Sequence, residues 1–300
     1  GAEQGLVLPP DAIARLKAMG VEPTDDSDKF HGREIRATVK AIWNGQNFDD
    51  TANASTAGMH QMGLVLDRTN FYAEMGGQVP DHGRLSAARQ VRQEVAMGAG
   101  GEFRVEDVQT YAGYVLHVGR MATHQRRVGD MVTLSLDSTR RDCVQANHTA
   151  THLLNLALRT VAGEGLDQKG SQVGPDKLRF DFSLSRPVTP EEIAQIDRQV
   201  SESVAASLDV FAQVTPLELA RKIKGLRAVF GEAYPDPVRV VMVGPETPAL
   251  ATHDDSIEFC GGTHMPRTGL IGYFKLVGQE GVAKGVRRLT GITGRHSLEA

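Results

Sequence analysis

Alternating apolar and polar residues dominate the first half of the chain. Partial alternation runs through REIRATVKAIW at 33–43, and two more alternating runs flank Gly113 at 103–119. Further strand candidates lie at 63–72 and, after a Gly-Asp turn, within 126–137. Glycine- and proline-rich turns separate these runs. Short strands at such spacing are typical of a small barrel or sandwich. We therefore predict a small β-rich domain, a barrel or a sandwich, over residues 30–140.

The segment before this region reads differently. Residues 1–29 contain PPDAIARLKAMG, which predicts a short helix with Pro10 near its start and Gly20 as its stop. The polar run VEPTDDSDK follows it. We expect residues 1–29 to be a linker or the end of a preceding domain.

Two helices are predicted after residue 140. NHTATHLLNLALRTVAG predicts one, with Asn147 as its N-cap and Gly163 at its end. In the second, Thr189 is the expected N-cap, Pro190 the first helical residue, and Glu192 the partner that completes a capping box. Apolar residues at steps of three and four predict that one face of this second helix is buried.

Strand patterns interrupt these helices without a regular strand–helix–strand alternation. They lie at 177–184, 238–244, 272–278 and 286–293. Such a mixture is typical of an α+β domain, which we place at residues 141–294. The chain as a whole is therefore predicted to be α+β, with an N-terminal small β-barrel followed by an α+β domain. Residues 295–300 are expected to begin a further C-terminal region that this sequence does not contain.

Composition and charge exclude several classes of protein and add no structural element. The formal net charge is −4, the hydrophobic fraction 40% and the charged fraction 23%, which excludes a histone-like basic protein and wholesale disorder. No apolar run approaches the roughly 18 to 20 residues of a membrane helix. Two cysteines in 300 residues do not form a disulfide scaffold. A reducing compartment, the cytoplasm, is the expected location.

The candidate chemistry lies in two pairs of residues. His148 and His152 are four residues apart on the helix predicted from Asn147 to Gly163, and they project from one face of it. Cys260 and His264 have the same spacing in FCGGTHMPRTG, where the glycines favour a tight loop. Three imidazoles and one thiolate make a tetrahedral set that suits Zn²⁺.

The fourth ligand and the role of the metal remain open at this stage. The rival ligands Cys143, His253 and Asp254 have spacings that fit neither pair. Four protein ligands are typical of a structural zinc site, whereas a catalytic zinc keeps one position for water. An HExxH metalloprotease helix is excluded, because Thr149 and Ala150 follow His148.

Nucleic acid contacts would need local positive charge in this mildly acidic chain. The best cluster, Lys284, Arg287 and Arg288, follows and overlaps the glycine-rich GQEGVAKG turn. The other basic pairs are Arg126 with Arg127, Arg140 with Arg141, and Lys222 with Lys224.

Several motifs follow one another along the second half of the chain: HTATHLL, QKGSQV, LRFDFS, CGGTH and GVRRLTGITG. In this order they closely resemble the editing domain of alanyl-tRNA synthetase and the related free-standing editing proteins. FYAEMGGQVPDHG resembles the small barrel before that domain. The threonyl-tRNA synthetase editing domain has a similar layout, but the barrel and the Gly-Gly-Thr between Cys260 and His264 favour the alanyl branch.

The resemblance implies hydrolysis of tRNA(Ala) mischarged with serine or glycine, with zinc bound by His148, His152, Cys260 and His264. It also implies roles for the following residues. Thr151 would distinguish serine from alanine, Gln168 and Ser171 would line the pocket, and Gly261 and Gly262 would let the backbone approach the substrate.

The expected partners are mischarged tRNA(Ala) and the rest of a synthetase chain, of which this chain would be an excised segment. A naturally separate editing protein is the other possibility. Two further alternatives remain: a non-catalytic tRNA-binding module with a structural zinc, and an unrelated zinc hydrolase.

Overall fold

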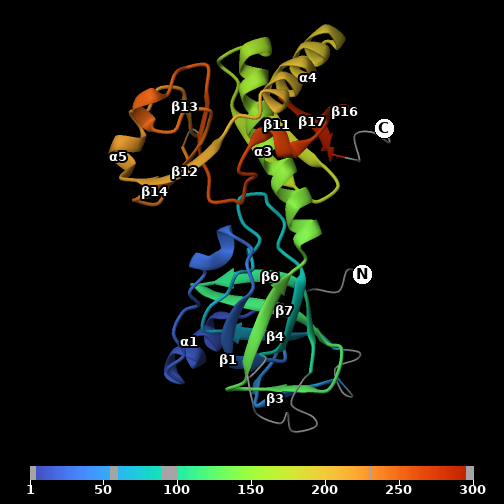
Figure 1. Ribbon diagram of the computed structural model, residues 1–300, viewed down its shortest axis with the longest axis vertical. Coiled ribbons are helices and arrows are strands. Elements are labelled where there is room, and N and C mark those ends of the chain that lie inside the picture. The colour runs from blue at the N-terminus through green and yellow to red at the C-terminus, as the bar shows by residue number, and fades with distance from the viewer. Residues whose placement is uncertain (1–4, 55–59, 89–100, 230, 295–300) are drawn as a thin grey trace. The chain divides into compact units, whose positions relative to one another are not determined.

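The computed structural model in Figure 1 describes residues 5–54, 60–88, 101–229 and 231–294. The chain divides into two compact units. The barrel unit consists of Gly1–Glu74 and Pro80–Arg141, and the metal unit consists of Met75–Val79 and Asp142–Ala300. The expected start of a further region at 295–300 lies outside the described residues. No helix in the described part of the chain is long and apolar enough to cross a membrane.

The barrel unit is a closed antiparallel sheet, so of the two architectures that the strand pattern allows it is the barrel. Its strands follow the order β1, β4, β7, β6, β5 and β9, and β9 pairs again with β1. These strands are β1 Ile35–Trp43, β4 Met62–Leu66, β5 Gly83–Ala87, β6 Phe103–Tyr111, β7 Tyr114–Met121 and β9 Met131–Leu136. Short strands complete it: β2 Phe48–Asp49 on β1, and β3 Thr51–Asn53 paired with β8 Gln125–Arg127. Apolar residues such as Leu64, Phe103 and Leu134 fill the core.

The segment expected as a linker packs on this barrel. Helix α1 (Pro10–Ala18) ends before Gly20, whose φ is 75°. Its residues Ala12 and Leu16 are buried in one cluster with Trp43 and Leu116. A short 3₁₀ helix, Ser27–Phe30, follows. This segment therefore contributes apolar core to the barrel unit.

Helix α3 spans Ser138–Ala162, so the predicted N-cap at Asn147 is wrong. The Asn147 side chain is instead buried inside the fold, where its Nδ2 donates to Gly174 O at 2.8 Å and its Oδ1 accepts from Thr293 Oγ1 at 2.7 Å. The C-terminal stop is confirmed, because Gly163 follows the helix with a φ of 124°. Tertiary contacts thus use the polar side chain that local reasoning assigned to a cap.

Helix α4 (Pro190–Ala205) has the predicted capping box. Thr189 Oγ1 accepts from the Glu192 backbone N–H, and the Glu192 carboxylate accepts from the Thr189 N–H. Ile196 and Val200 are buried. They pack in one cluster with apolar residues of α3 and of the neighbouring sheet, such as Leu154.

Two four-stranded sheets complete the metal unit and confirm its α+β class. One sheet has the order β10 Gln168–Val173, β11 Leu178–Ser183, β17 Val286–Thr293 and β16 Phe274–Ala283. The other has the order β12 Val210–Thr215, β14 Val238–Val243, β15 Ser256–Phe259 and β13 Leu226–Arg227. The remaining short helices are α5 Leu217–Ala220 and the 3₁₀ turns Pro248–Leu250 and Thr268–Ile271. Strand β15 leads directly into the loop that carries Cys260.

Candidate metal centre

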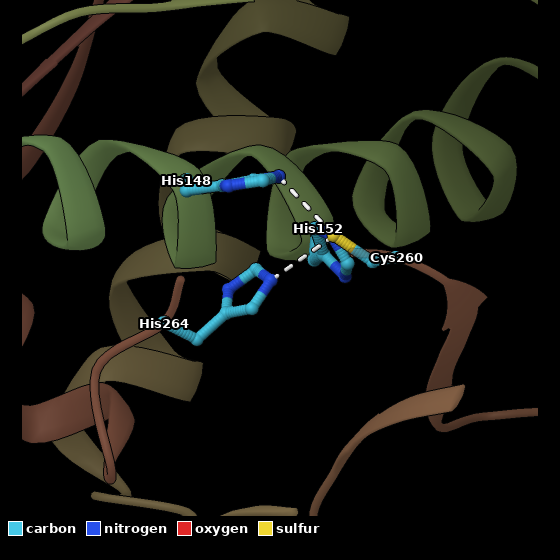
Figure 2. Close-up of side chains that lie close together, drawn as sticks. All are labelled: His148, His152, Cys260 and His264. Carbon is cyan, nitrogen blue, oxygen red and sulfur yellow. Dashed lines mark hydrogen bonds between the residues drawn. The ribbon is translucent and has the colours of Figure 1, made fainter. Parts of the chain in front are cut away.

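The structure brings the four predicted ligands together (Figure 2). Helix α3 presents His148 and His152 one turn apart, and the loop after β15 presents Cys260 and His264. One ligand atom from each residue lies within 4.8 Å of the others. Cys260 Sγ is 3.4 Å from His148 Nε2 and 3.3 Å from His264 Nε2. The group can therefore hold a metal ion.

This donor set fits a tetrahedral ion. Zinc lies roughly 2.0–2.1 Å from imidazole nitrogen and about 2.3 Å from thiolate sulfur, so neighbouring ligand atoms around it are about 3.5 Å apart. The two measured sulfur–nitrogen separations are close to that edge length. Cys260, His148 and His264 thus have spacings that suit such an ion, and the ligand atom of His152 completes the group within 4.8 Å.

Burial sets the protonation of the four side chains. It lowers the pKa of His148 and His264 well below the ordinary value, and that of His152 to about 3. The imidazoles are therefore neutral, which is the form that binds metals. Burial raises the pKa of Cys260 to about 12. Its proton would consequently leave only when a metal stabilises the thiolate.

Arg239 on β14 binds the loop that carries Cys260. Arg239 Nη1 donates to Cys260 O at 2.9 Å and to Gly262 O at 2.8 Å. The Gly262 N–H in turn points at Cys260 Sγ, 3.4 Å away. These contacts fix the loop backbone and place a hydrogen-bond donor beside the sulfur.

Gln78 supports His148 from outside the ligand set. Its Oε1 accepts the Thr263 N–H at 2.9 Å and lies 2.7 Å from His148 Nδ1. Its Nε2 donates to Thr263 Oγ1 at 2.8 Å, which fixes the orientation of the amide. An acceptor at Oε1 requires a proton on His148 Nδ1, so Nε2 keeps its lone pair for a metal.

Thr149 has the corresponding place beside His264. Its Oγ1 accepts the Met265 N–H at 3.0 Å and lies 3.1 Å from His264 Nδ1. Sequence reasoning did not assign either Gln78 or Thr149 to the site. The signal for Gln78 was present, because it lies in the FYAEMGGQVPDHG motif that supports the family resemblance.

The remaining predicted site residues also belong to the metal unit. Thr151 is buried, and its hydroxyl donates to Asn147 O at 2.8 Å. Gln168 begins β10 and lines a small cavity. Ser171 lies against Gly77, where an added β carbon would be 2.4 Å from Ser171 O. Gly261 is exposed and has open space beside it.

The rival ligands lie apart from the group. His253 and Asp254 are exposed, Cys143 is half-buried on α3, and none of them belongs to the four-residue group found among the described residues. The structure therefore supports the set chosen from spacing.

The basic candidates differ in their surroundings. Lys284 is exposed, whereas Arg288 donates to Asp181 from Nε at 2.7 Å and from Nη2 at 3.0 Å. Arg287 Nη2 donates to Gln279 Oε1 at 3.2 Å. Two other candidates, Arg126 and Arg141, are buried and hydrogen-bonded within the barrel unit, whereas Arg127, the neighbour of Arg126, is exposed.

Comparison with known proteins agrees with this picture. Residues 11–140 match the family of class II (A) tRNA synthetases, and residues 238–290 match the second additional domain of threonyl and alanyl tRNA synthetases. The barrel unit and the metal-bearing unit together therefore define a class II aminoacyl-tRNA synthetase segment.

Relatives that match nearly the whole of this chain make the assignment more specific. The chain is 44% identical to the cytoplasmic alanine–tRNA ligase of Dictyostelium discoideum over 98% of its length and 31% of that protein. It is 46% identical to the alanine–tRNA ligase of Anaeromyxobacter dehalogenans (90% of this chain, 28% of that one) and 39% identical to the human mitochondrial enzyme (99% and 31%). The chain belongs to the alanyl-tRNA synthetase family, as its motifs predict, and spans less than a third of these relatives.

Proposed function

We propose that this chain hydrolyses the ester of tRNA(Ala) mischarged with serine or glycine, using Zn²⁺ held by His148, His152, Cys260 and His264. One observation carries the proposal. In a member of the alanyl-tRNA synthetase family, three neutral imidazoles and a thiol converge beside an exposed glycine backbone. When bound, Zn²⁺ would supply Lewis acidity and a fixed charge to orient an aminoacyl ester.

The chain's own residues would bind and position the substrate. An aminoacyl ester is already activated, so holding it beside a water molecule supplies much of the rate. Gly261 has no side chain and no neighbour within 4 Å of its β position, so an ester can approach the backbone there. Gln168 and Ser171, at the two ends of QKGS on β10, would line the pocket.

Thr151 would provide the discrimination between serine and alanine. Its hydroxyl proton is used on Asn147 O, so its oxygen lone pairs remain to accept a hydrogen bond. A serine hydroxyl can donate that bond, and an alanine methyl group cannot. A site built around such a bond rejects the analogue that lacks it by large factors.

The partner in this reaction would be the acceptor end of tRNA(Ala), together with the rest of a synthetase. Lys284, Arg287 and Arg288 are the proposed phosphate contacts, and Lys284 is the exposed member. We place the activity in the cytoplasm, on the low cysteine content. The relatives include proteins named as cytoplasmic and as mitochondrial.

A second function is favoured by the number of ligands. Four protein side chains surround the candidate metal position, and closed sets of this kind are usually structural. The chain would then be a non-catalytic tRNA-binding module whose metal stabilises the fold.

The deciding experiment measures serine released from Ser-tRNA(Ala), with Ala-tRNA(Ala) as the spared substrate. Wild type is compared with Cys260→Ala and with Cys143→Ala, the matched variant at a half-buried cysteine outside the metal group. We expect release by wild type and Cys143→Ala, and loss of both release and bound zinc in Cys260→Ala. A folded, zinc-loaded wild type that hydrolyses neither substrate, even with the other synthetase domains added in trans, would establish the structural alternative.

A further inference from the structure

A largely buried carboxyl group, that of Glu258, lies beside the imidazole of His152. Glu258 belongs to β15, and its side chain is 12% exposed, against 6% for His152. Glu258 Oε2 lies 3.2 Å from His152 Nδ1. Both atoms are buried, and neither makes a hydrogen bond among the described residues. Two polar atoms left in this way carry a free-energy cost unless they bond each other.

The surroundings hold Glu258 in this place. Asn155 Nδ2 donates to Glu258 Oε1 at 2.9 Å. His152, Asn155 and Arg159 follow one another at steps of three and four on α3, so they share one helix face. Arg159 and Arg227 add positive charge near the carboxyl group and oppose the rise in its pKa that burial causes. One oxygen is thereby fixed by Asn155, and the other faces the imidazole.

We propose that Glu258 is a positioning residue that accepts the Nδ1–H of His152 and so directs the Nε2 lone pair of that ring to the metal. The inference rests on the proposed metal site. It gives His152 the support that Gln78 gives His148 and Thr149 gives His264. All three imidazoles would then have a partner at Nδ1, and each would present Nε2.

The inference is tested by zinc affinity, measured by competition with a chelator, and by the visible spectrum of the Co²⁺-substituted protein. The variant is Glu258→Gln, which keeps the shape of the side chain. Because Asn155 donates to the oxygen at the Oε1 position, the new NH₂ group would face the Nδ1–H of His152, donor against donor. We expect zinc binding to weaken by about 10- to 100-fold, as for other partners of metal-bound histidines.

The matched control is Glu164→Gln. Glu164 is 82% exposed, lies 3.8 Å from Arg227 and does not belong to the metal group. The substitution Glu164→Gln removes a negative charge near Arg227 and changes no residue of the metal group. We expect unchanged zinc affinity and an unchanged Co²⁺ spectrum.

The outcomes separate the two proposals. A wild-type protein that binds neither zinc nor cobalt overturns the proposed metal site and this inference together. A wild-type protein that binds both metals, with equal affinity and an equal spectrum in Glu258→Gln, overturns this inference alone. If Glu258→Gln does not fold, Asn155→Ala replaces it, because it frees the carboxyl group to turn away from His152. A severalfold loss of zinc affinity supports the inference, and unchanged affinity overturns it.

Discussion

Gly262 lies against the imidazole ring of His148, so close that a β carbon at residue 262 would be 2.1 Å from His148 Cε1. The same β carbon would be 2.7 Å from Gln78 Oε1. Both neighbours are buried. The absence of a side chain at residue 262 is therefore what lets the ligand-bearing loop pass helix α3.

Gly262→Ala should displace the His148 ring from its hydrogen bond with Gln78. We expect zinc affinity, measured by chelator competition, to fall by about 10-fold or more, which is the cost of losing such a partner. Gly261→Ala is the matched control, because a β carbon there meets no atom within 4 Å. It should bind zinc normally. Equal affinities in the two variants would contradict the close approach.

Gln78→Ala should leave two buried donors without an acceptor, the His148 Nδ1–H and the Thr263 N–H. We expect a loss of about 1–3 kcal/mol in the free energy of unfolding, measured by urea titration. Zinc affinity should fall as well. Gln46→Ala, at an exposed loop position of the barrel unit, should change neither quantity.

Asp81→Asn should destabilise the barrel unit. Arg141 donates to both oxygens of Asp81 and also to Lys29 O and Asn70 O, and both charged side chains are about 5% exposed. Removing one charge from a buried pair costs about 3–5 kcal/mol. The single tryptophan, Trp43, is buried in this unit, so its fluorescence during urea unfolding reports the loss.

The control for this variant is Glu102→Gln, which removes an exposed pair with Arg104 at 3.6 Å. Pairs of this kind contribute about 0–1 kcal/mol. A loss in Asp81→Asn no larger than in the control would show that the buried pair does not stabilise the unit.

Thr189→Ala should remove the cap of α4. Its hydroxyl oxygen accepts the Glu192 N–H, and loss of such a cap costs about 0.5–2 kcal/mol. Thermal unfolding followed by circular dichroism measures the effect. Thr160→Ala is the control, since that exposed hydroxyl caps no helix: it donates to Leu156 O within α3 at 3.0 Å and accepts from Gln199 Nε2 at 3.3 Å. A loss in Thr160→Ala equal to that in Thr189→Ala would argue against the capping role.

Lys284→Ala should weaken binding of tRNA(Ala) and reduce the dependence of binding on salt. Lys284 is exposed at the turn between β16 and β17. Losing one phosphate contact should make the fall of log affinity with log salt shallower, by about 0.9 in slope. Lys17→Ala, an exposed lysine on α1, is the charge-matched control. The same slope in both variants would remove Lys284 from the RNA contacts.

Local sequence rules predicted the elements whose signals are themselves local. The capping box of α4 and the alternating strands of the barrel are confirmed because the residues that decide them are close in sequence. The start of α3 was missed because STRRDCVQA has no apolar period, and the helix there is held by contacts that sequence spacing does not show. Asn147 looked like a cap for the same reason.

The same distinction applies to the metal centre. The ligand pairs could be recognised because each has a four-residue spacing on one element. Gln78 and Glu258 could not be recognised from spacing. Gln78 is 70 residues from His148 and 185 from Thr263, and only the folded chain brings them together.

The five residues Met75–Val79 belong to the metal unit, although the chain on both sides of them belongs to the barrel unit. The backbone of this segment is paired with β10 through Val79 and Val173. The two units are consequently not interchangeable modules. A chain that began at residue 142 would lack Gln78, so a shortened chain that is meant to keep the support of His148 has to include residues 75–79.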